Sequence, residues 1–485
     1  MTILRDILYN VDVEYIIGDT NIEISDLFFN SKDVIKSSLF VAVCGVNQDG
    51  YTYISSAIKR GAIAIVLEKD INEPISSITY IKVNNSSKAL SVLSSNFFDN
   101  PCNKLKLIGI TGTNGKTSTA YYVFSLLKKL NFSVGLISTI ENKINDKSFP
   151  SSYTTPDSLE INRLLYNMVE NQCEICVMEV SSHGLSQNRV YSLNFDVAVF
   201  TNLTRDHLDF HKNFSDYLSA KKIFFDQLNE AATSIINKDD EHFEIMVSNT
   251  KSKKVFYSLE SQSDYSAQII NNSLSGLCIT INKKHIKSNL VGKFNAYNLL
   301  SAYSIACELG LDQKQSLMAL KHIKCVPGRF NIIRSSKGVV GIIDYAHTPD
   351  ALLQAINTII DSSSSKNKLI TLIGCGGNRD KGKRPIMGKI AAEHSSYAIF
   401  TSDNPRFEEP DKIIIDMCSG LSSSLIQKPK VIIDRESAIK HAVEIANPNS
   451  VVLIAGKGHE NYQEIAGSKL PFSDIKLLTK YFKTK

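Results

Sequence analysis

Residues 104–130 read KLKLIGITGTNGKTSTAYYVFSLLKKL. The stretch joins an apolar run, a glycine-rich turn and an amphipathic pattern, which predicts a strand, a loop and a helix in that order. Backbone N–H groups of such a loop and of the helix N-terminus can bind phosphates, a lysine adds positive charge, and a threonine can reach Mg²⁺. The pattern therefore predicts a nucleoside triphosphate site at Gly112, Thr113, Asn114, Gly115, Lys116, Thr117 and Ser118.

One position departs from the general phosphate-loop pattern. Ile110 stands five residues before Gly115, where that pattern has a glycine. The alternative interpretation is a tight glycine turn followed by a lysine in solvent. The strand before the turn and the helix after it favour the phosphate site.

The chain divides into three segments of α/β character, and we expect domains at 1–100, 101–325 and 326–485. The first segment has strand patterns at 39–45, 62–68 and 78–83 and helix patterns at 53–61 and from Ser86. The second opens with the phosphate loop and continues in α/β alternation. The molecule is therefore expected to be an α/β protein of several domains.

The last segment alternates strands with helices near 349–360, 384–394, 410–421 and 436–446. Strands that are separated by helix-length crossovers predict a parallel, doubly wound sheet. Ligands of such a sheet bind at the carboxyl ends of its strands. Those ends are expected at Asp344, Gly374, Asp403 and Gly456.

Composition narrows the class of protein. The 485 residues are about three times the usual domain length, and a hydrophobic share of 43% is enough for buried cores. Lys and Arg number 54 against 49 Asp and Glu, a surplus too small to favour nucleic acid as a partner. No stretch approaches the roughly 18 apolar residues of a membrane span, and the N-terminus lacks a signal-peptide pattern. We expect a cytoplasmic protein with no membrane anchor.

The nine cysteines are scattered along the chain, which is typical of reduced thiols. Cys173 and Cys176 have the spacing of half a zinc site, but no second pair of ligands lies nearby in the sequence. They fall where a helix pattern passes into a strand. We interpret both as structural.

Acidic and imidazole side chains follow the strands downstream of the loop. Glu179 comes near the end of the apolar run ICVMEV, and His207 and His211 fall within FTNLTRDHLDFH. Taken alone, the two histidines could be half of a zinc site or ordinary loop residues. After a phosphate loop, acids and histidines at strand ends suit Mg²⁺, which keeps several waters and needs few protein ligands.

Three loops of the last segment concentrate glycine and charge at predicted strand ends. They are residues 374–385, 403–406 and 455–460. An arginine there can bind a carboxylate through two hydrogen bonds, which lysine cannot do in the same geometry. The alternative is a solvated basic loop. Since all three loops are expected to meet in one crevice, they favour a binding site.

Together these motifs resemble the Mur ligases of peptidoglycan synthesis, and within that family the branch that adds 2,6-diaminopimelate. The resemblance extends from Asn30 to Asp474. It is carried by GTNGKTS, SYTTP, EVSSHGLSQNRV, TNLTRDHLDFH, YLSAKK, GKFNAYN, DYAHTPDAL, GCGGNRDKGKRP, DNPR and AGKGHE.

The resemblance implies three domains: an N-terminal domain for the UDP end of the substrate, a central P-loop ATPase domain and a C-terminal Rossmann-like domain. It implies that ATP phosphorylates the D-glutamate γ-carboxylate of UDP-N-acetylmuramoyl-L-alanyl-D-glutamate. The amine of meso-diaminopimelate then attacks the acyl phosphate and forms an amide. Mg²⁺ is the implied cofactor, and we expect a monomer that acts on these small molecules.

The resemblance also implies site residues. Catalytic roles would fall on Lys116, Glu179, His207 and Lys221. Mg²⁺ would meet Thr117, Glu179, His207 and Lys221, the last as N6-carboxylysine formed with CO₂. Further ATP contacts would be Asn295, Arg329 and Asp344. The UDP substrate would contact Ser31, Thr154, Thr155, Ser181, Gln187 and Arg189. Diaminopimelate would contact Arg384, Asp403, Asn404, Pro405, Arg406, Gly456 and Glu460.

Arg406 is expected to set the choice of amino acid, because diaminopimelate has a carboxylate that L-lysine lacks. Glu460 and the carbonyl of Gly456 would bind the amino group beside that carboxylate. The alternative is that Arg406 only braces its loop through Glu408 or Glu409.

The family commonly has Asp-Ser-Arg where this chain has Asn30-Ser31-Lys32, and lysine lacks the planar fork of arginine. The sequence leaves three alternative functions: the sister ligase that adds L-lysine, folylpolyglutamate synthase, and a non-catalytic nucleotide-sensing protein on the same fold. The DNPR string and the N-terminal similarity argue against the first two. The intact set Lys116, Glu179, His207 and Lys221 argues against the third.

Overall fold

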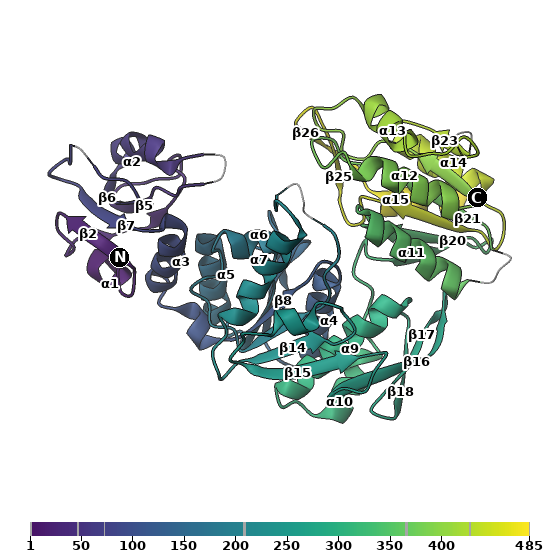
Figure 1. Ribbon diagram of the computed structural model, residues 1–485, viewed down its shortest axis with the longest axis horizontal. Helices are drawn as coiled ribbons and strands as arrows, with labels where there is room; N and C mark the ends of the chain where they lie inside the picture. The colour runs from purple at the N-terminus through teal and green to yellow at the C-terminus, as the bar shows by residue number, and fades with distance from the viewer. Residues whose placement is uncertain are drawn as a thin grey trace.

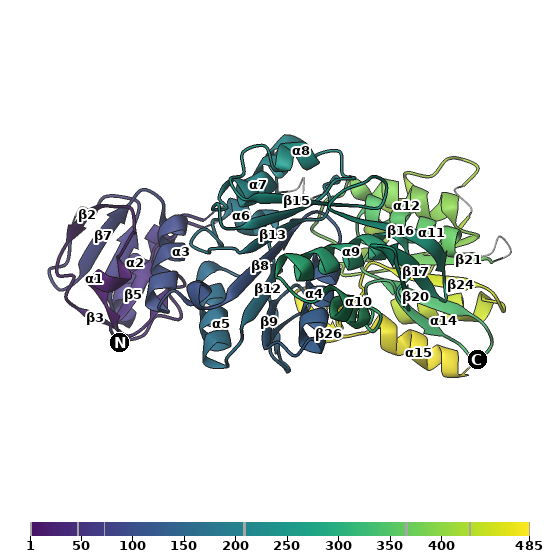
Figure 2. The same ribbon diagram turned by 90° about the horizontal axis from the view of Figure 1, so that it is seen from below.

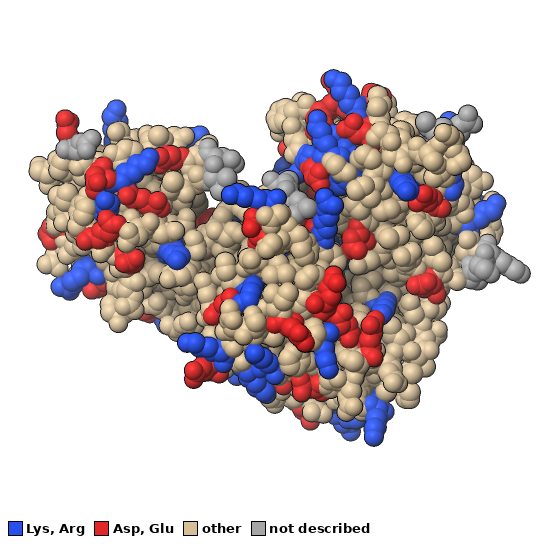
Figure 3. Space-filling view, in the orientation of Figure 1, with Lys and Arg blue, Asp and Glu red and all other residues tan. Residues whose placement is uncertain are grey.

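The computed structural model describes residues 2–45, 48–71, 73–206, 210–363, 367–425 and 428–484. These residues form three α/β lobes that follow one another in chain order along a bent row (Figure 1). Seen from below, the same order runs along the long axis of the molecule (Figure 2). Each lobe is built on its own main sheet, and a wide hollow lies between the first and last lobes above the central one (Figure 3). The predicted three-domain α/β architecture is confirmed.

The N-terminal lobe has a five-stranded sheet with helices on both faces. The strand order is β2 (Val13–Ile17), β7 (Thr79–Val83), β6 (Ala62–Leu67), β5 (Ser38–Val41) and β4 (Leu27–Phe28). Alternate residues of β6 enter two cores: Ala64 and Val66 pack with α3 (Ser86–Phe97), and Ile65 and Leu67 pack with α2 (Ile54–Arg60). This period of two explains why the unbroken apolar run AIAIVL forms a strand that is buried on both faces.

Short elements complete this lobe. They are β1 (Thr2–Ile3), α1 (Leu4–Ile7), β3 (Glu23–Ile24) and the 3₁₀ helix η1 (Gly50–Tyr53). A second 3₁₀ helix, η2 (Pro101–Lys104), leads into the central lobe.

The central lobe holds an eleven-stranded sheet with β8 (Lys106–Thr111) near its middle. The order is β11 (Lys147–Pro150), β10 (Glu141–Ile144), β9 (Val134–Ile137), β12 (Ile175–Glu179), β8, β13 (Val197–Phe200), β14 (Thr233–Asn237), β15 (Lys253–Ser258), β16 (Tyr265–Ser273), β17 (Gly276–Ile281) and β18 (Lys284–Ser288). Strands β9, β12, β8, β13, β14, β15 and β16, which are neighbours in this order, run parallel. Their carboxyl ends therefore share one edge of the sheet.

Helices cover both faces of this sheet. On one face α4 (Lys116–Lys129), α9 (Lys293–Glu308) and α10 (Gln313–Leu320) share a core, and on the other α5 (Ser158–Glu170) and α7 (Phe214–Asp226) share a second core. The lobe also contains α6 (Ser182–Ser186) and α8 (Phe243–Met246). Because α4 follows β8 directly, its N-terminus lies at the carboxyl edge of the sheet.

The edges of the central sheet differ from the predicted α/β alternation. β10 and β11 form an antiparallel hairpin at one edge, and β16, β17 and β18 form an antiparallel meander at the other. The turn between β17 and β18 is Asn282-Lys283, with φ of +48° and +63°. Two positive φ angles in a two-residue turn match the right-handed twist of a hairpin. Asn282 favours this geometry and Lys283 does not, so the sequence signal for the hairpin was weak.

The C-terminal lobe confirms the predicted doubly wound sheet. Its order is β19 (Asn331–Arg334), β20 (Val340–Asp344), β24 (Val451–Ala455), β21 (Leu369–Ile373), β22 (Tyr397–Phe400) and β23 (Pro429–Val431), and only the pairing of β19 is antiparallel within it. One face carries α11 (Pro349–Ser362), α12 (Lys383–His394) and α13 (Pro410–Cys418), and the other carries α14 (Arg435–Ile445) and α15 (Asp474–Thr484).

Two details of this lobe bear on the site. Asp344 ends β20, Gly374 and Gly456 directly follow β21 and β24, and Asp403 lies three residues beyond β22, so these residues lie at the carboxyl edge as predicted. A small hairpin of β25 (Tyr462–Ile465) and β26 (Ser468–Pro471), which the sequence did not indicate, lies beside the loop after β22.

Cys173 and Cys176 are buried in the core between α5 and β12, and burial raises the pKa of both thiols. Their predicted structural role fits this position. Within the described ranges, no helix has the length and apolar character that crossing a bilayer requires.

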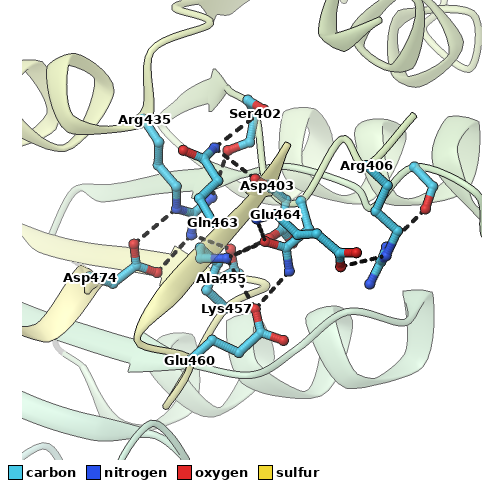
Figure 4. Close-up of polar contacts among 12 residues, drawn as sticks. Ser402, Asp403, Arg406, Arg435, Ala455, Lys457, Glu460, Gln463, Glu464 and Asp474 are labelled. Carbon is cyan, nitrogen blue, oxygen red and sulfur yellow. Dashed lines mark hydrogen bonds and ion pairs between the residues drawn. The ribbon is translucent and has the colours of Figure 1, made fainter. Parts of the chain in front are cut away.

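Arg435 and Asp474 tie the C-terminal lobe together through a buried ion pair. Arg435 Nε and Nη2 donate to Asp474 Oδ1 and Oδ2 at 2.9 and 2.8 Å, and neither side chain is exposed. Nη2 also donates to the carbonyl of Ala455 at 3.0 Å (Figure 4). The pair therefore joins the first residues of α14 and α15 to the end of β24.

We expect Arg435→Ala to lower the free energy of unfolding of this lobe by about 3–5 kcal/mol, because Asp474 would stay buried without its counter-charge. Urea unfolding measures the change. The matched control is Lys440→Ala, whose side chain is 59% exposed and whose ammonium lies 3.9 Å from Glu444. The control should change stability by less than about 0.5 kcal/mol. A loss under about 1 kcal/mol for Arg435→Ala would contradict the role of the pair.

Candidate nucleotide and substrate site

The predicted phosphate loop connects β8 to α4 and needs its glycines. Gly112 and Gly115 have φ of +145° and +86°, a region that L side chains rarely adopt. A Cβ on Gly112 would lie 1.9 Å from Thr201 Oγ1, so the loop packs directly against the end of β13. No side chain caps α4, whose first N–H groups have no partner within the helix. The loop thus presents the positive end of a fourteen-residue helix.

Two lysines converge behind this loop. Lys116 Nζ donates to the carbonyls of Gly112 and Thr113, both at 2.8 Å, and Lys221 Nζ donates to the same Gly112 carbonyl at 2.8 Å. Lys221 is buried in α7, and burial together with the nearby charge of Lys116 holds its pKa well below the usual value. Burial also lowers the pKa of Lys116. Two lysine amines thus donate to one carbonyl oxygen where phosphate charge would be bound.

Glu179 lies beside the loop at the end of β12. Thr117 Oγ1 donates to Glu179 Oε2 at 2.9 Å, and the N–H and Oγ1 of Thr139 donate to Oε1 at 2.8 and 3.0 Å. The carboxylate is buried, with 1% of the residue exposed. Thr117 and Glu179 therefore offer oxygen ligands next to the helix N-terminus, which fits Mg²⁺ beside nucleotide phosphates.

Of the two histidines that the sequence suggested for a metal, the structure describes His211. His207 lies outside the described residues. His211 is buried, with its ring 5.2 Å from that of Tyr217 and 5.8 Å from that of His183. Among the residues that the structure describes, no three His, Cys, Asp or Glu side chains gather as a metal centre.

The C-terminal lobe reaches the same place through Arg329 and Asp344. Arg329 Nη2 donates to Thr117 Oγ1 at 3.3 Å, and its guanidinium lies 4.5 Å from the ring centre of Tyr345. Asp344 Oδ2 accepts the N–H of Phe330 at 2.6 Å. Burial raises the pKa of Asp344 to about 6, against the nearby charge of Arg329. Arg329 thus lies next to the phosphate loop, and Asp344 lies near Arg329.

Asn295 is not placed at an open surface. It is buried in α9, where its Oδ1 accepts Tyr122 Oη at 2.8 Å and its Nδ2 donates to the carbonyl of Val291 at 2.8 Å. The side chain thus links α9 to α4 behind the loop. A direct contact of Asn295 with the nucleotide stays a prediction.

A residue that the sequence did not single out joins the C-terminal lobe to the phosphate loop. Asp350, in the first turn of α11, accepts Asn114 Nδ2 at 3.0 Å and Thr204 Oγ1 at 3.1 Å on the same Oδ2. In the sequence the acid follows Thr348-Pro349, a usual helix start that already accounts for a carboxylate there. The contact of Asp350 with Asn114 and Thr204 becomes visible only when the two lobes are packed together.

The predicted substrate residues of the central lobe form one cluster beside Glu179. Arg189 Nη1 donates to the carbonyl of Thr155 at 2.6 Å and its Nη2 to Gln187 Oε1 at 2.7 Å. Thr154 Oγ1 lies 3.1 Å from Thr139 Oγ1, within hydrogen-bond distance, and Ser181 caps α6 by accepting the N–H of Gly184 at 3.1 Å. The structure therefore brings all five residues of this set together.

Ser31, the sixth, lines a separate cavity of about 750 Å³ between the N-terminal lobe and α5. Asn30 and Lys32, at the departure from the family pattern, line it as well. Arg163 of α5 faces the same cavity and supplies a guanidinium that the sequence did not indicate. The segment Val46-Asn47-Gln48 also differs from the better-known family pattern; Gln48 lines the same cavity, and Val46 and Asn47 lie outside the described residues.

The third part of the site is the loop after β22 with its neighbours (Figure 4). Arg406 pairs with Glu464 of β25 at 3.0 Å and donates to the carbonyl of Gly377 at 2.8 Å. Its φ of +52° is held by backbone hydrogen bonds to the β25–β26 hairpin. The alternative predicted that Arg406 pairs with Glu408 or Glu409. It is wrong, because the acid that pairs with Arg406 is Glu464.

Glu408 is instead the partner of Arg384. Arg384 is buried, and its Nη1 donates to Glu408 Oε2 at 2.9 Å and to Asp416 Oδ2 at 2.8 Å. The ion pair holds the pKa of Glu408 at about 2. These contacts give Arg384 a role in holding the loops in place, and a direct contact with the amino acid stays a prediction.

The remaining residues of this set lie around Glu460. Asn404 Nδ2 donates to Glu460 Oε2 at 2.8 Å, Asp403 lies within 2.8 Å of where a Cβ on Gly456 would be, and the Pro405 carbonyl packs on Gly377. The two loops after β22 and β24 thus meet, as predicted.

Comparison with known proteins identifies the family. Residues 110–306 match the Mur ligase middle domain, and residues 328–458 match the Mur ligase glutamate ligase domain. UDP-N-acetylmuramoyl-L-alanyl-D-glutamate–2,6-diaminopimelate ligases of Bacteroides thetaiotaomicron and Parabacteroides distasonis are each 45% identical to this chain over 99% of its length, and the matches cover 100% and 99% of those proteins.

Solved structures agree. A UDP-N-acetylmuramoyl-L-alanyl-D-glutamate–2,6-diaminopimelate ligase superposes with a TM-score of 0.70 and 29% identity over 100% of this chain and 99% of its own. The MurF ligase of Thermotoga maritima, solved with ADP, shares the fold with a TM-score of 0.64 and 21% identity, covering 95% of this chain and 97% of its own.

The phosphate loop, the two lysines and the carboxyl-edge loops thus belong to an ATP-dependent amide-bond ligase, and the chain is a member of the Mur ligase family. Its full-length curated relatives in that family include the ligases that carry 2,6-diaminopimelate in their names.

We expect nucleotide binding to depend on the ionisation of Asp344. With a pKa of about 6, this carboxyl is mostly ionised at pH 7.5 and mostly protonated at pH 5.5. An ionised carboxylate accepts ribose hydroxyl hydrogen bonds better, so the Kd of ADP should rise about fourfold from this group as the pH falls from 7.5 to 5.5.

Asp344→Asn is the matched control, because it keeps the titration of the nucleotide and of all other groups. Calorimetric titration of both proteins at the two pH values measures the difference. Equal pH dependence in the two proteins would show that Asp344 does not contact the nucleotide in this way.

Proposed function

We propose that this protein joins the amino group of meso-diaminopimelate to the D-glutamate γ-carboxylate of UDP-N-acetylmuramoyl-L-alanyl-D-glutamate, with conversion of ATP to ADP and phosphate, in peptidoglycan biosynthesis. One observation carries the proposal. At the end of β8, Thr117 of the central lobe contacts both Glu179 of the same lobe and Arg329 of the C-terminal lobe, and Lys116 donates to the carbonyl of Gly112 in the same loop. This is where an anionic acceptor and an anionic nucleotide must be held together.

The proposed reaction has two covalent steps. A γ-carboxylate oxygen attacks the γ-phosphorus of ATP, the bond to the bridging oxygen breaks, and ADP leaves. The amine then attacks the acyl carbon, loses a proton, and phosphate leaves with the C–O bonding pair. The first step is needed because a carboxylate is a poor electrophile, whereas phosphate is a good leaving group.

The described residues suit the first step. Lys116, Arg329 and the N-terminus of α4 place positive charge and N–H donors where two anions approach, and they do so in a partly buried site. Thr117 and Glu179 would hold Mg²⁺, which neutralises phosphate charge when bound. Arg189, Gln187 and Thr155 would orient the peptide end of the substrate beside Glu179.

Phosphate release tests the proposal directly. ATP, the UDP-dipeptide and meso-diaminopimelate together should release phosphate and form the UDP-tripeptide, and omission of either acceptor should abolish both. Lys116→Ala should be folded and inactive, because the lysine is needed where phosphate charge develops and not in a core. Nucleotide binding without product in the wild type would favour the non-catalytic, nucleotide-sensing alternative.

The domain boundaries near residues 100 and 325 belong to the same proposal. They are supported by the three separate sheets, since η2 (Pro101–Lys104) leads into β8 and α10 ends at Leu320 before β19 begins at Asn331. We also propose that the protein is a monomer in the cytoplasm that acts on small molecules. On the face shown in Figure 3, acidic and basic side chains are interspersed, which supports small-molecule partners over nucleic acid.

We further propose that Lys221 carries a carbamate. A carbamate forms from CO₂ and a neutral amine, and the lowered pKa of Lys221 favours the neutral form. The modification would convert one of the two amines at the Gly112 carbonyl into an anion that can organise Mg²⁺. The neighbour Lys222 is a poorer candidate, because it points away into an ion pair with Asp226 at 2.6 Å.

We expect Lys221→Ala to reduce ligation by about 10²-fold or more, and added short-chain carboxylates should restore part of it. In the wild type, ¹³C-bicarbonate should give a carbamate signal in ¹³C NMR that Lys221→Ala lacks. Lys222→Ala is the matched control and should keep both the signal and the activity. If only Lys222→Ala lost the signal, the modified residue would be Lys222 and not Lys221.

A further prediction concerns which amino acid the protein selects. Arg406 keeps a guanidinium at the carboxyl edge, where Glu464 and Gly377 fix its position. Loss of an arginine that pairs with a desolvated carboxylate costs on the order of 2–5 kcal/mol. Arg406→Ala should therefore raise the KM of meso-diaminopimelate by well over tenfold, with little change in the KM of ATP.

Competition between meso-diaminopimelate and L-lysine completes this test. The wild type should prefer diaminopimelate strongly, and Arg406→Ala should lose most of that preference. Lys389→Ala, an exposed lysine of α12, serves as the control. Equal kcat/KM for the two amino acids in the wild type would mean that the protein is not selective at this loop.

A further inference from the structure

Lys457 is a fully buried lysine at the centre of the two loops that the proposed function assigns to the amino acid. It follows Gly456 at the end of β24, and none of its side chain is exposed. Its Nζ donates to Asn404 Oδ1 at 2.8 Å, to Glu460 Oε2 at 3.0 Å and to Asp403 Oδ1 at 3.4 Å (Figure 4). The three donors of the ammonium thus meet three side-chain oxygens.

The acceptors come from different parts of the chain. Asp403 and Asn404 belong to the loop after β22, and Glu460 belongs to the loop after β24. Asn404 adds two further links, because its Nδ2 donates to Glu460 Oε2 at 2.8 Å and its Oδ1 accepts the N–H of Glu464 at 2.9 Å. Lys457 and Asn404 therefore lock the two loops and the β25–β26 hairpin to one another.

The geometry at Glu460 is one-sided. Lys457 and Asn404 both bind Oε2. Within the described part of the chain, no hydrogen bond or ion pair that we find uses Oε1. A carboxylate held by one oxygen in this way presents its other oxygen in a fixed direction. This is the arrangement expected of a side chain that receives an ammonium group.

The charges point the same way. Lys457 lies within salt-bridge distance of both Asp403 and Glu460, whereas Arg435 is committed to Asp474 and Arg406 to Glu464. Without Lys457, two largely buried carboxylates would face each other across the loops. Burial already raises the pKa of Glu460, and Lys457 opposes that rise. The lysine therefore helps to keep Glu460 anionic.

We infer that Lys457 is a positioning residue that fixes Glu460 for recognition of the distal ammonium group of the incoming diamino acid. The inference rests on the proposed function and extends it, since Lys457 itself touches neither substrate nor nucleotide. A lysine that only stabilised the fold would affect all substrates alike. A positioning residue that acts through Glu460 affects the substrates that carry a distal ammonium group.

L-2-Aminopimelate separates these cases. It has the reacting amino group and both carboxylates of diaminopimelate but no distal ammonium group. Since Glu460 would be left without its partner, the wild type should prefer meso-diaminopimelate over 2-aminopimelate by on the order of 10⁴-fold in kcat/KM. The ratio of the two kcat/KM values reports on recognition of the distal ammonium group, by Glu460 and the carbonyl of Gly456, and not on the rest of the substrate.

In Lys457→Gln, which keeps a hydrogen-bond donor and removes the charge, we expect this ratio to fall about tenfold or more, with the KM of ATP changed less than about twofold. Equal losses for the two amino acids would overturn the inference and leave Lys457 a structural residue. Thermal unfolding of the variant shows that it is folded under the assay conditions.

Two controls sharpen the experiment. Lys440→Gln removes an exposed lysine of the same lobe and should change nothing. Arg435→Lys weakens the neighbouring buried pair, so it should lower the melting temperature but keep the ratio. If Arg435→Lys lowers the ratio as much as Lys457→Gln does, destabilisation of the lobe explains both and the inference fails.

A double-variant cycle keeps the inference testable if Lys457→Gln is poorly stable. Glu460→Gln alone should collapse the ratio, and Lys457→Gln added to it should lower the ratio no further, because the lysine acts through Glu460. Additive losses would contradict the inference. A wild type that ligates no amino acid would instead refute the proposed function, which keeps the two failures distinct.

Discussion

The carbonyl oxygen of Gly112 accepts hydrogen bonds from two lysines of different helices, Lys116 at the start of α4 and Lys221 within α7. Two amines that converge on one backbone oxygen disfavour each other's charged form, and burial together with the charge of Lys116 holds the pKa of Lys221 well below its usual value. Glu179 ends the adjacent strand, and the open N-terminus of α4 lies beside it. The charge at the phosphate loop thus depends on the balance among two lysines, one carboxylate and a helix N-terminus.

The three sheets contribute to this balance in different ways. The central parallel sheet places β8, β12 and β13 side by side, so that their carboxyl ends bring Gly112, Glu179 and Thr201 within contact of the loop. The C-terminal sheet brings Asp344 and the loops at residues 374–385, 403–406 and 455–460 to its own carboxyl edge. The N-terminal sheet forms a cavity with α5 that is separate from the loop. A long substrate that reaches from this cavity to the phosphate loop fits the arrangement of the lobes.

Much of this architecture could be predicted from the sequence, because strands that are buried on both faces read as unbroken apolar runs between helical patterns. The phosphate loop and the carboxyl-edge residues followed from the same pattern. The antiparallel edges could not be predicted, since the turn at Asn282-Lys283 places a lysine at a positive φ without a glycine. Partners in space were also hidden. Arg406 pairs with Glu464 and not with the nearer acids in the chain, because the β25–β26 hairpin folds back against it.

Roles that depend on burial were the hardest to predict. Lys221 and Lys457 look like surface lysines in the sequence, and only packing shows that both are enclosed. Lys221 came from the family resemblance, and Lys457 was not singled out at all. The distinction matters because lysine is rarely buried without a specific partner. The burial of these two lysines is thus the stronger functional signal, and it becomes visible only in three dimensions.

The contact of Asp350 with the phosphate loop has a mechanical consequence. Both hydrogen bonds that this residue accepts from the central lobe, from Asn114 and Thr204, end on one oxygen atom. Hydrogen bonds weaken steeply with distance and angle, so a small displacement of α11 would release both at once. The position of α11 is therefore coupled directly to Asn114 of the phosphate loop, and both contacts would be lost together if the two lobes moved apart at this point.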